Sequence, residues 1–133
     1  MRRLNLLCVR SADGKRVLVC RRRKPPFAGL LNFPGGKAEP GETGAQAAYR
    51  ELREETGLTE ADITLQHIMD LTYYPEDMVL EVYTGCLIAE RAVCGDENPL
   101  LWVSADEDFF DVTRFAGYGN LGHIMAHIVQ NGL

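Results

Sequence analysis

The segment 43–56 is the strongest helix signal in the chain, and it limits the folds that the other segments can adopt. Thr43 and Gln46 are spaced as a capping box, in which each side chain satisfies a backbone N–H of the other residue at a helix start. Gly57 suits the position just after a helix, where the backbone turns left-handed. The intervening apolar residues fall on one face, namely Ala45, Ala48, Tyr49 and Leu52. The sequence therefore predicts an amphipathic helix that ends at about Thr56 and packs on another element.

Short apolar runs on both sides of this helix predict the β-sheet on which it packs. The runs 4–9 and 17–20 are separated by Asp13-Gly14, a typical hairpin turn. The runs 63–73, 78–87 and 100–103 are rich in β-branched, aromatic and aliphatic residues and predict further strands. Between them, residues 24–41 hold four prolines and four glycines, which predicts a long structured loop.

Two further helices are expected near the C-terminal end of the sequence. Ser104 and Glu107 have the spacing of a capping box and predict a short helix. The apolar positions 121, 124, 125 and 128 predict a last helix, with Asn120 before it and Gly132 after it. Strands around a central helix, followed by a terminal helix, indicate an α/β fold with a mixed sheet packed between helices.

Length and charge narrow the class of protein. The chain has 133 residues, which predicts one domain spanning 1–133. Lys and Arg number 14 and Asp and Glu number 19, so the net charge of −5 argues against polymeric nucleic acid as a partner. No apolar run is long enough for a membrane span, and the four cysteines form no CxxC pair. We therefore expect a reduced, cytoplasmic protein with no membrane partner.

The predicted central helix carries an unfavourable cluster of acids. Glu51, Glu54 and Glu55 are spaced i, i+3 and i+4, which costs about 0.2–0.5 kcal/mol per like-charged pair. Anions in the last turn also oppose the helix dipole, at a cost of about 0.3–1 kcal/mol. A bound hard cation such as Mg²⁺ would compensate. The alternative is a solvated acidic face balanced by Arg50 and Arg53.

The segment 36–58 resembles the complete Nudix box, Gx5Ex7REUxEExGU with U an aliphatic residue. It has a glycine, five residues, a glutamate, seven residues and then the run RELREETGL, with no position departing from the pattern. The preceding segment 32–37, NFPGGK, is similar to the MutT-type branch of that family, which removes damaged nucleoside triphosphates. The resemblance implies a Nudix-type α/β/α sandwich and metal-dependent hydrolysis of a nucleoside diphosphate linked to another group.

The resemblance also implies roles for individual residues around Mg²⁺ or Mn²⁺. It places metal ligation on the backbone carbonyl of Gly35 and on glutamate side chains, namely Glu51, Glu54, Glu55 and, from a later loop, Glu97. Asp96 is the rival for that loop position. Arg50 is similar to the arginine that orients the loop and the glutamates, and Glu42 to an outer-shell or secondary ligand. Sequence alone sets neither the glutamate that acts as general base nor the oligomeric state.

Four residues are expected to contact the substrate. Arg21 and Lys37 resemble phosphate-binding cations of MutT-type proteins. Asn32 and Asn120 resemble residues that contact the purine, since an amide offers both a donor and an acceptor to a base edge. For Asn120 the alternative is a purely structural role as the N-cap of the last helix.

The expected function is hydrolysis of a nucleoside triphosphate, with an oxidised purine such as 8-oxo-dGTP preferred, to a monophosphate and pyrophosphate. Other Nudix substrates stay open, including a modified pyrimidine triphosphate, an ADP-sugar and a dinucleoside polyphosphate. The cluster Tyr73-Tyr74-Pro75 lies where relatives acting on the last two classes carry a marker residue. A non-catalytic nucleotide sensor on the same fold is the alternative from another class, although such domains typically lose box acids.

Overall fold

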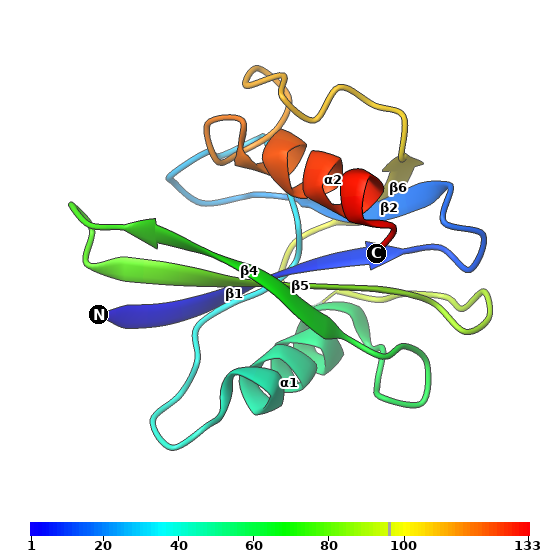
Figure 1. The fold of residues 1–133 in the computed structure, drawn as a ribbon, viewed down its shortest axis with the longest axis horizontal. Coiled ribbons are helices and arrows are strands. Elements are labelled where there is room, and N and C mark those ends of the chain that lie inside the picture. Colours follow the sequence, from blue (N-terminus) through cyan, green and yellow to red (C-terminus); the bar gives the residue numbers. More distant parts are fainter. Residues whose placement is uncertain (96) are drawn as a thin grey trace.

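A computed structural model describes residues 1–95 and 97–133, and it contains a mixed six-stranded sheet with helices on both faces (Figure 1). In chain order the elements are β1 (Arg2–Arg10), β2 (Arg16–Arg21), β3 (Leu31–Asn32), α1 (Gly44–Thr56), β4 (Gln66–Tyr73), β5 (Met78–Cys86), β6 (Leu100–Ser104) and α2 (Asn120–Asn131). Helix α1 lies against one face of the sheet and α2 against the other (Figure 1). This arrangement is the predicted α/β/α sandwich.

The strand order places β1 at the centre of the sheet. The order is β3-β2-β1-β5-β4, and β6 pairs with β2. β1 is parallel to β5 over its whole length, from Arg2 opposite Met78 to Arg10 opposite Cys86, while the other pairings are antiparallel. The predicted hairpin between β1 and β2 is confirmed, and Gly14 in its turn has φ +74°, a conformation that glycine adopts without strain.

Alternation along β1 supplies apolar side chains to two separate cores. Leu6 and Cys8 face the layer that contains α2, whereas Leu7 and Val9 face the layer that contains α1. Neighbouring residues of a strand point to opposite faces, so a continuous apolar run is what a strand covered on both faces requires. The burial of these side chains fixes the register of the central strand and thereby the position of the segment that pairs with it.

The predicted capping of α1 is confirmed at both ends. The Thr43 hydroxyl accepts a hydrogen bond from the Gln46 N–H at 3.1 Å, and the Gln46 side chain accepts one from the Thr43 N–H at 2.9 Å. Gly57 adopts φ +77° and donates its N–H to the Arg53 carbonyl at 2.9 Å. The helix therefore ends at the acidic cluster, and its capping fixes where those carboxylates lie relative to the sheet.

Two expectations near the C-terminal end are wrong. The short helix expected from Ser104 and Glu107 is absent from this described segment. The Ser104 hydroxyl accepts from the Asp106 N–H at 3.1 Å, and the Glu107 carboxylate pairs with Arg114 at 2.5 Å, so neither side chain serves a helix start. Asn120 is not the N-cap of α2 either, because Gly119 holds that position without a side-chain cap.

The four cysteines differ in burial and in the pKa of their thiols. All four cysteines are free; Cys8 and Cys20 are buried, while Cys86 and Cys94 are exposed. Burial raises the pKa of the Cys8 thiol to about 12 and that of Cys20 to about 11. Among the described residues, neither helix combines the length and the apolar character that crossing a membrane demands.

Candidate active site

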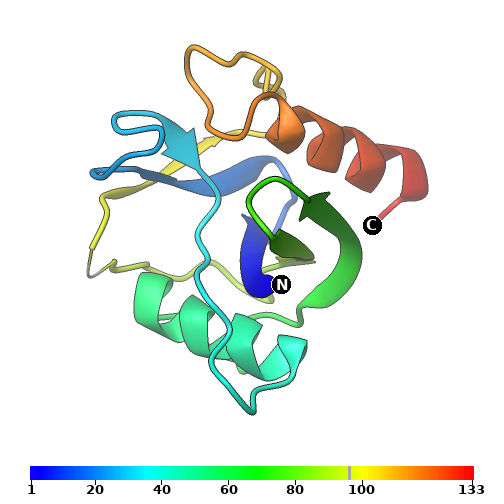
Figure 2. The ribbon, with the colours of Figure 1, turned by 90° about the vertical axis from the view of Figure 1, so that its left-hand side faces the viewer.

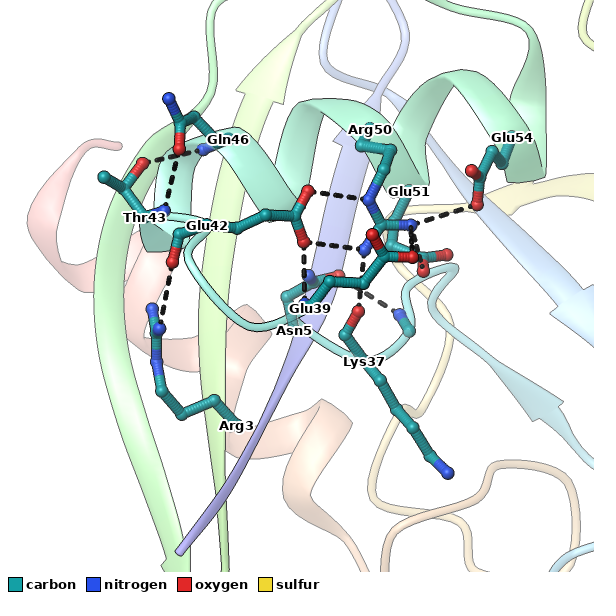
Figure 3. Close-up of polar contacts among 11 residues, drawn as sticks. Arg3, Asn5, Lys37, Glu39, Glu42, Thr43, Gln46, Arg50, Glu51 and Glu54 are labelled. Carbon is teal, nitrogen blue, oxygen red and sulfur yellow. Dashed lines mark hydrogen bonds and ion pairs between the residues drawn. The ribbon is translucent and has the colours of Figure 1, made fainter.

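Arg50, a partly buried residue of α1, is the centre of a polar network (Figure 3). Its guanidinium donates to both carboxylate oxygens of Glu42, at 2.7 and 2.9 Å, and to the Lys37 carbonyl at 2.8 Å. The same group donates to Glu51 at 3.0 Å and to Glu54 at 3.1 Å. One arginine therefore joins the helix to the preceding loop and binds three of the box glutamates. A planar guanidinium suits this task because its five N–H donors point outward in fixed directions.

The segment after β3 brings the Gly35-Gly36 backbone into direct contact with the acidic cluster. Figure 2 shows this segment running down one face of the molecule, from the level of α2 to the start of α1. A Cβ atom at position 36 would lie 2.4 Å from the Glu51 carboxylate carbon, and one at position 35 would lie 2.1 Å from the Asn5 carbonyl oxygen. Gly35 also has φ +155°. Only glycine allows this approach, so the two glycines position the loop against Glu51.

Asn5, from the central strand, anchors the same loop, and the sequence analysis did not identify it. Asn5 is 2% exposed. Its side-chain oxygen accepts from the Gly36 N–H at 3.1 Å, and its backbone N–H donates to the Gly36 carbonyl at 2.8 Å. Its Nδ2 has no hydrogen-bond partner among the described residues. The available sequence signal was a lone polar residue inside the apolar run 4–9.

The carboxylates of the network have different electrostatic environments. Burial raises the pKa of Glu51, against the lowering effect of Arg50, and the negative charges of Glu54 and Glu97 raise it further. The Arg50 hydrogen bonds lower the pKa of Glu42 to about 2. Glu42 is therefore a permanent anion that keeps Arg50 in place, whereas Glu51 is the carboxylate that most needs a compensating positive charge.

The remaining acids lie at the C-terminal end of α1 and in the loop beside it. The loop is joined to the helix by the Cys94 N–H, which donates to the Thr56 carbonyl at 3.0 Å. Glu97 is exposed, and its charge acts on Glu51. Glu55 is partly buried, and its charge contributes to the raised pKa of Cys20 in β2. Asp96, the rival to Glu97, lies outside the described residues.

The donor chemistry fits a hard divalent cation, although the glutamates are arranged around Arg50. Among residues 1–95 and 97–133, no three His, Cys, Asp or Glu side chains are grouped closely enough to hold a metal ion. Glu54 is exposed and is turned toward Arg50 (Figure 3). Carboxylate and backbone carbonyl oxygens are the ligands that Mg²⁺ and Mn²⁺ prefer. The absence of a Cβ at position 36 lets the loop backbone lie directly against the Glu51 carboxylate.

Neither predicted phosphate-binding cation reaches into the Arg50 network. Arg21, at the end of β2, donates to the Gly29 carbonyl at 2.9 Å and so closes the loop between β2 and β3. The Lys37 amino group points away from the carboxylates (Figure 3), and only the Lys37 carbonyl belongs to the network. Both side chains are exposed. Arg21 therefore lies at the end of β2, and Lys37 directly follows the Gly35-Gly36 pair.

The two predicted base-contacting asparagines belong to different layers. Asn120 is in α2, whereas Asn32 lies between Leu31 and Phe33, which face the α2-side core, and therefore points to the opposite face of the sheet. Asn32, at the end of β3, accepts through its side-chain oxygen from the Phe33 N–H at 2.9 Å. Asn120, at the start of α2, donates from Nδ2 to the Tyr73 hydroxyl. The backbone segments beside the two asparagines are in contact, because Leu31, next to Asn32, forms a parallel β-bridge with Phe115. The side-chain contact of Asn120 is thus a long-range one, not the local cap considered from sequence.

Comparisons with known proteins point to one family. A family model described as NUDIX domain matches residues 1–116. A Mycobacterium tuberculosis protein named "Putative 8-oxo-dGTP diphosphatase 2" is 37% identical over 108 residues, which cover 78% of this chain and 77% of that protein. The 8-oxo-dGTP diphosphatase of Escherichia coli is 40% identical over 57 residues, 43% of this chain and 44% of that protein.

A solved structure shows the same fold over almost the whole chain. A structure from a study of MutT from Aliivibrio salmonicida and Vibrio cholerae covers 97% of this chain and 98% of its own, with a TM-score of 0.75 and 22% sequence identity. At that identity the likeness shows the fold alone, while the family model and the 37% identical relative show membership. The chain therefore belongs to the Nudix family and is a hydrolase of nucleotide phosphoanhydrides.

Proposed function

We propose that this Nudix hydrolase cleaves a purine nucleoside triphosphate, preferably an oxidised one such as 8-oxo-dGTP, to a nucleoside monophosphate and pyrophosphate. The observation that carries the proposal is the network in which Arg50 binds Glu42, Glu51 and Glu54 beside the Gly35-Gly36 loop. The names of the M. tuberculosis and E. coli relatives support the substrate class.

We call the side chains of Glu51, Glu54, Glu55 and Glu97 the acidic network, and this network is the proposed site for Mg²⁺ or Mn²⁺. The Gly35 carbonyl and the side chains of Glu51, Glu54, Glu55 and Glu97 would hold the ions. When bound, such ions neutralise phosphate charge and lower the pKa of water. To bind an ion, the exposed Glu54 carboxylate would give up its i,i+4 ion pair with Arg50. Losing such a pair costs about 0.3–0.5 kcal/mol of stability.

The protein's own side chains would bind and orient the substrate and move one proton. A carboxylate of the acidic network would accept the proton of the attacking water as general base. Arg50 would act as a positioning residue, because its contacts with Lys37 O and Glu51 keep the loop and the helix at a fixed separation. Arg21 and the Lys37 amino group would bind phosphate oxygens.

Asn32 and Asn120 are the proposed base contacts. An amide that pairs with the edge of the correct purine leaves a polar group unpaired with the wrong one, which allows strong discrimination. Because Gly119 is the N-cap of α2, replacing Asn120 by alanine removes no helix cap. This asparagine is therefore free to serve recognition without a conflicting structural task at the helix start.

The proposed setting is a single domain, residues 1–133, acting in the cytoplasm on a free nucleotide and not on polymeric nucleic acid or a membrane. Four free thiols, two of them exposed, suit a reducing compartment. The net charge of −5 disfavours a nucleic-acid polymer, while local cations such as Arg21 leave room for one small anionic substrate.

A panel of nucleotides tests the proposed function. With Mg²⁺ present, we expect kcat/KM for 8-oxo-dGTP to exceed that for dGTP, a modified pyrimidine triphosphate, ADP-ribose and a dinucleoside polyphosphate, with pyrophosphate as the co-product. Chromatography of the products gives both the rate and the bond cleaved. A higher kcat/KM for ADP-ribose or the dinucleoside polyphosphate would replace the proposed substrate class. Binding without turnover of any nucleotide would identify a sensor instead of an enzyme.

A further inference from the structure

The side chain of Asn120 is held by a residue 47 positions away in the sequence. Its Nδ2 donates to the hydroxyl of Tyr73, the last residue of β4. Asn120 and Tyr73 are both partly buried. Among the described residues, no hydrogen bond reaches the Asn120 Oδ1 atom. The contact with Tyr73 therefore orients the carboxamide: one of its two N–H donors is occupied, and the direction of its Oδ1 acceptor is fixed.

A pair of aromatic residues lies near this contact. Tyr118, 77% exposed, packs edge-on against Phe27 with ring centroids 4.9 Å apart. Burial raises the pKa of Tyr73, the Asn120 hydrogen bond lowers it, and the charges of Glu76 and Tyr118 raise it further. Phe27 and Tyr118 both have positive φ, +66° and +58°. For bulky residues this conformation costs about 1–3 kcal/mol and clusters at functional sites. Aromatic side chains from two loops thus gather where β4 meets α2.

We propose that Tyr73 is a positioning residue that sets the base preference of this enzyme by fixing the carboxamide of Asn120, an inference that rests on the proposed function. With Nδ2 donating to Tyr73, Asn120 offers its Oδ1 acceptor to a base edge that presents an N–H. A base with an acceptor at the same point would place two lone pairs face to face. A freely rotating amide would present its donor to such a base and lose this discrimination.

Tyr73→Phe tests this assignment by removing one oxygen atom and keeping the ring. We expect the ratio of kcat/KM for 8-oxo-dGTP to that for dGTP to fall about threefold to tenfold, the value of one hydrogen bond. This substrate pair differs at N7, which carries a hydrogen in the oxidised base and is an acceptor in guanine. Tyr74→Phe is the matched control, because Tyr74 is 78% exposed and should leave the ratio unchanged.

A double-mutant cycle with Asn120→Ala separates positioning from a structural effect. If Tyr73 acts through Asn120, then Tyr73→Phe changes the ratio in the parent enzyme and has no further effect in Asn120→Ala. A tyrosine needed only for folding would lower the melting temperature and reduce kcat/KM for both triphosphates equally. Equal reduction, or an effect of Tyr73→Phe that persists in Asn120→Ala, would overturn the assignment while the proposed function stands. Absence of triphosphate hydrolysis in the parent enzyme would overturn both.

Discussion

Replacing Glu54 or Glu55 by glutamine is expected to lower kcat by about 100-fold to 10,000-fold while the protein remains folded. Each change removes one anionic oxygen from the site proposed for Mg²⁺ or Mn²⁺ and for the general base, and these contributions have that size. The measurement is steady-state turnover of 8-oxo-dGTP at saturating Mg²⁺, with EDTA as the metal-free reference.

Thermal stability without metal should change little in Glu54→Gln. The lost ion pair with Arg50 is an i,i+4 pair on an exposed side chain, worth about 0.3–0.5 kcal/mol. Removing an anion from the last helical turn returns about 0.3–1 kcal/mol. Added Mg²⁺ should raise the melting temperature of the parent protein and raise it less in the variant, because a ligand stabilises only the state that binds it.

Glu60→Gln is the matched control for these two variants. Glu60 is exposed and lies just beyond the C-terminal end of α1, outside the proposed site, so its replacement should leave turnover and the Mg²⁺ effect unchanged. Full activity in EDTA, or parent-like turnover in both Glu54→Gln and Glu55→Gln, would contradict the assignment of the acidic network as the metal site.

Arg50→Lys is expected to lower kcat/KM by about 100-fold or more, although it preserves the charge. The guanidinium binds Glu42, Glu51 and the Lys37 carbonyl simultaneously, at 2.7 to 3.0 Å. A lysine ammonium donates from a single atom and cannot span these acceptors. The loop and the helix would then lose their fixed separation, and a misplacement of about 1 Å can cost about 100-fold in rate.

The same variant should also lower the melting temperature, because Glu51 is buried and would lose its partner.

Arg53→Lys is the matched control on the next turn of α1. Arg53 is exposed, and its side chain makes no hydrogen bond within the described part of the chain. A parent-like rate and melting temperature in Arg50→Lys would show that charge alone suffices at this position.

The parts of this structure that local chemistry determines could be predicted from the sequence. Helix α1 has its start and its end encoded within the segment itself, by Thr43 with Gln46 and by Gly57, and both were predicted. The apolar runs predicted the strands for the same reason, because a strand buried on both faces needs consecutive apolar residues. The resemblance to the Nudix box implied that Arg50 orients the loop and the glutamates, and in the structure Arg50 binds Glu51 and the Lys37 carbonyl.

Long-range partners could not be predicted in this way. Ser104 and Glu107 have the spacing of a capping box, but an ion pair with Arg114 takes the glutamate side chain and no helix starts there. The sequence offered Asn120 two roles, a cap or a base contact, and the structure gives it Tyr73 as a partner. Neither partner follows from the local pattern: Arg114 lies seven residues beyond Glu107 in the same connection, and Tyr73 lies 47 residues before Asn120.

The acidic cluster shows the same limit within a predicted element. Helical spacing predicts that Glu51, Glu54 and Glu55 converge on one patch. In the structure Glu51 and Glu54 share Arg50, which lies between them, while the charge of Glu55 acts on Cys20 in β2. Nor does spacing reveal Asn5, which reaches the loop from the centre of the sheet.

Hydrolysis in ¹⁸O-labelled water tests the central claim most directly. With purified protein, 8-oxo-dGTP and Mg²⁺, the proposed reaction inserts one water oxygen per bond cleaved, so mass analysis should find a single ¹⁸O in either the nucleoside monophosphate or the pyrophosphate. The two products should appear in equal amounts from the start of the reaction. Orthophosphate as the sole primary product, with a nucleoside diphosphate as its partner, would contradict the proposed cleavage.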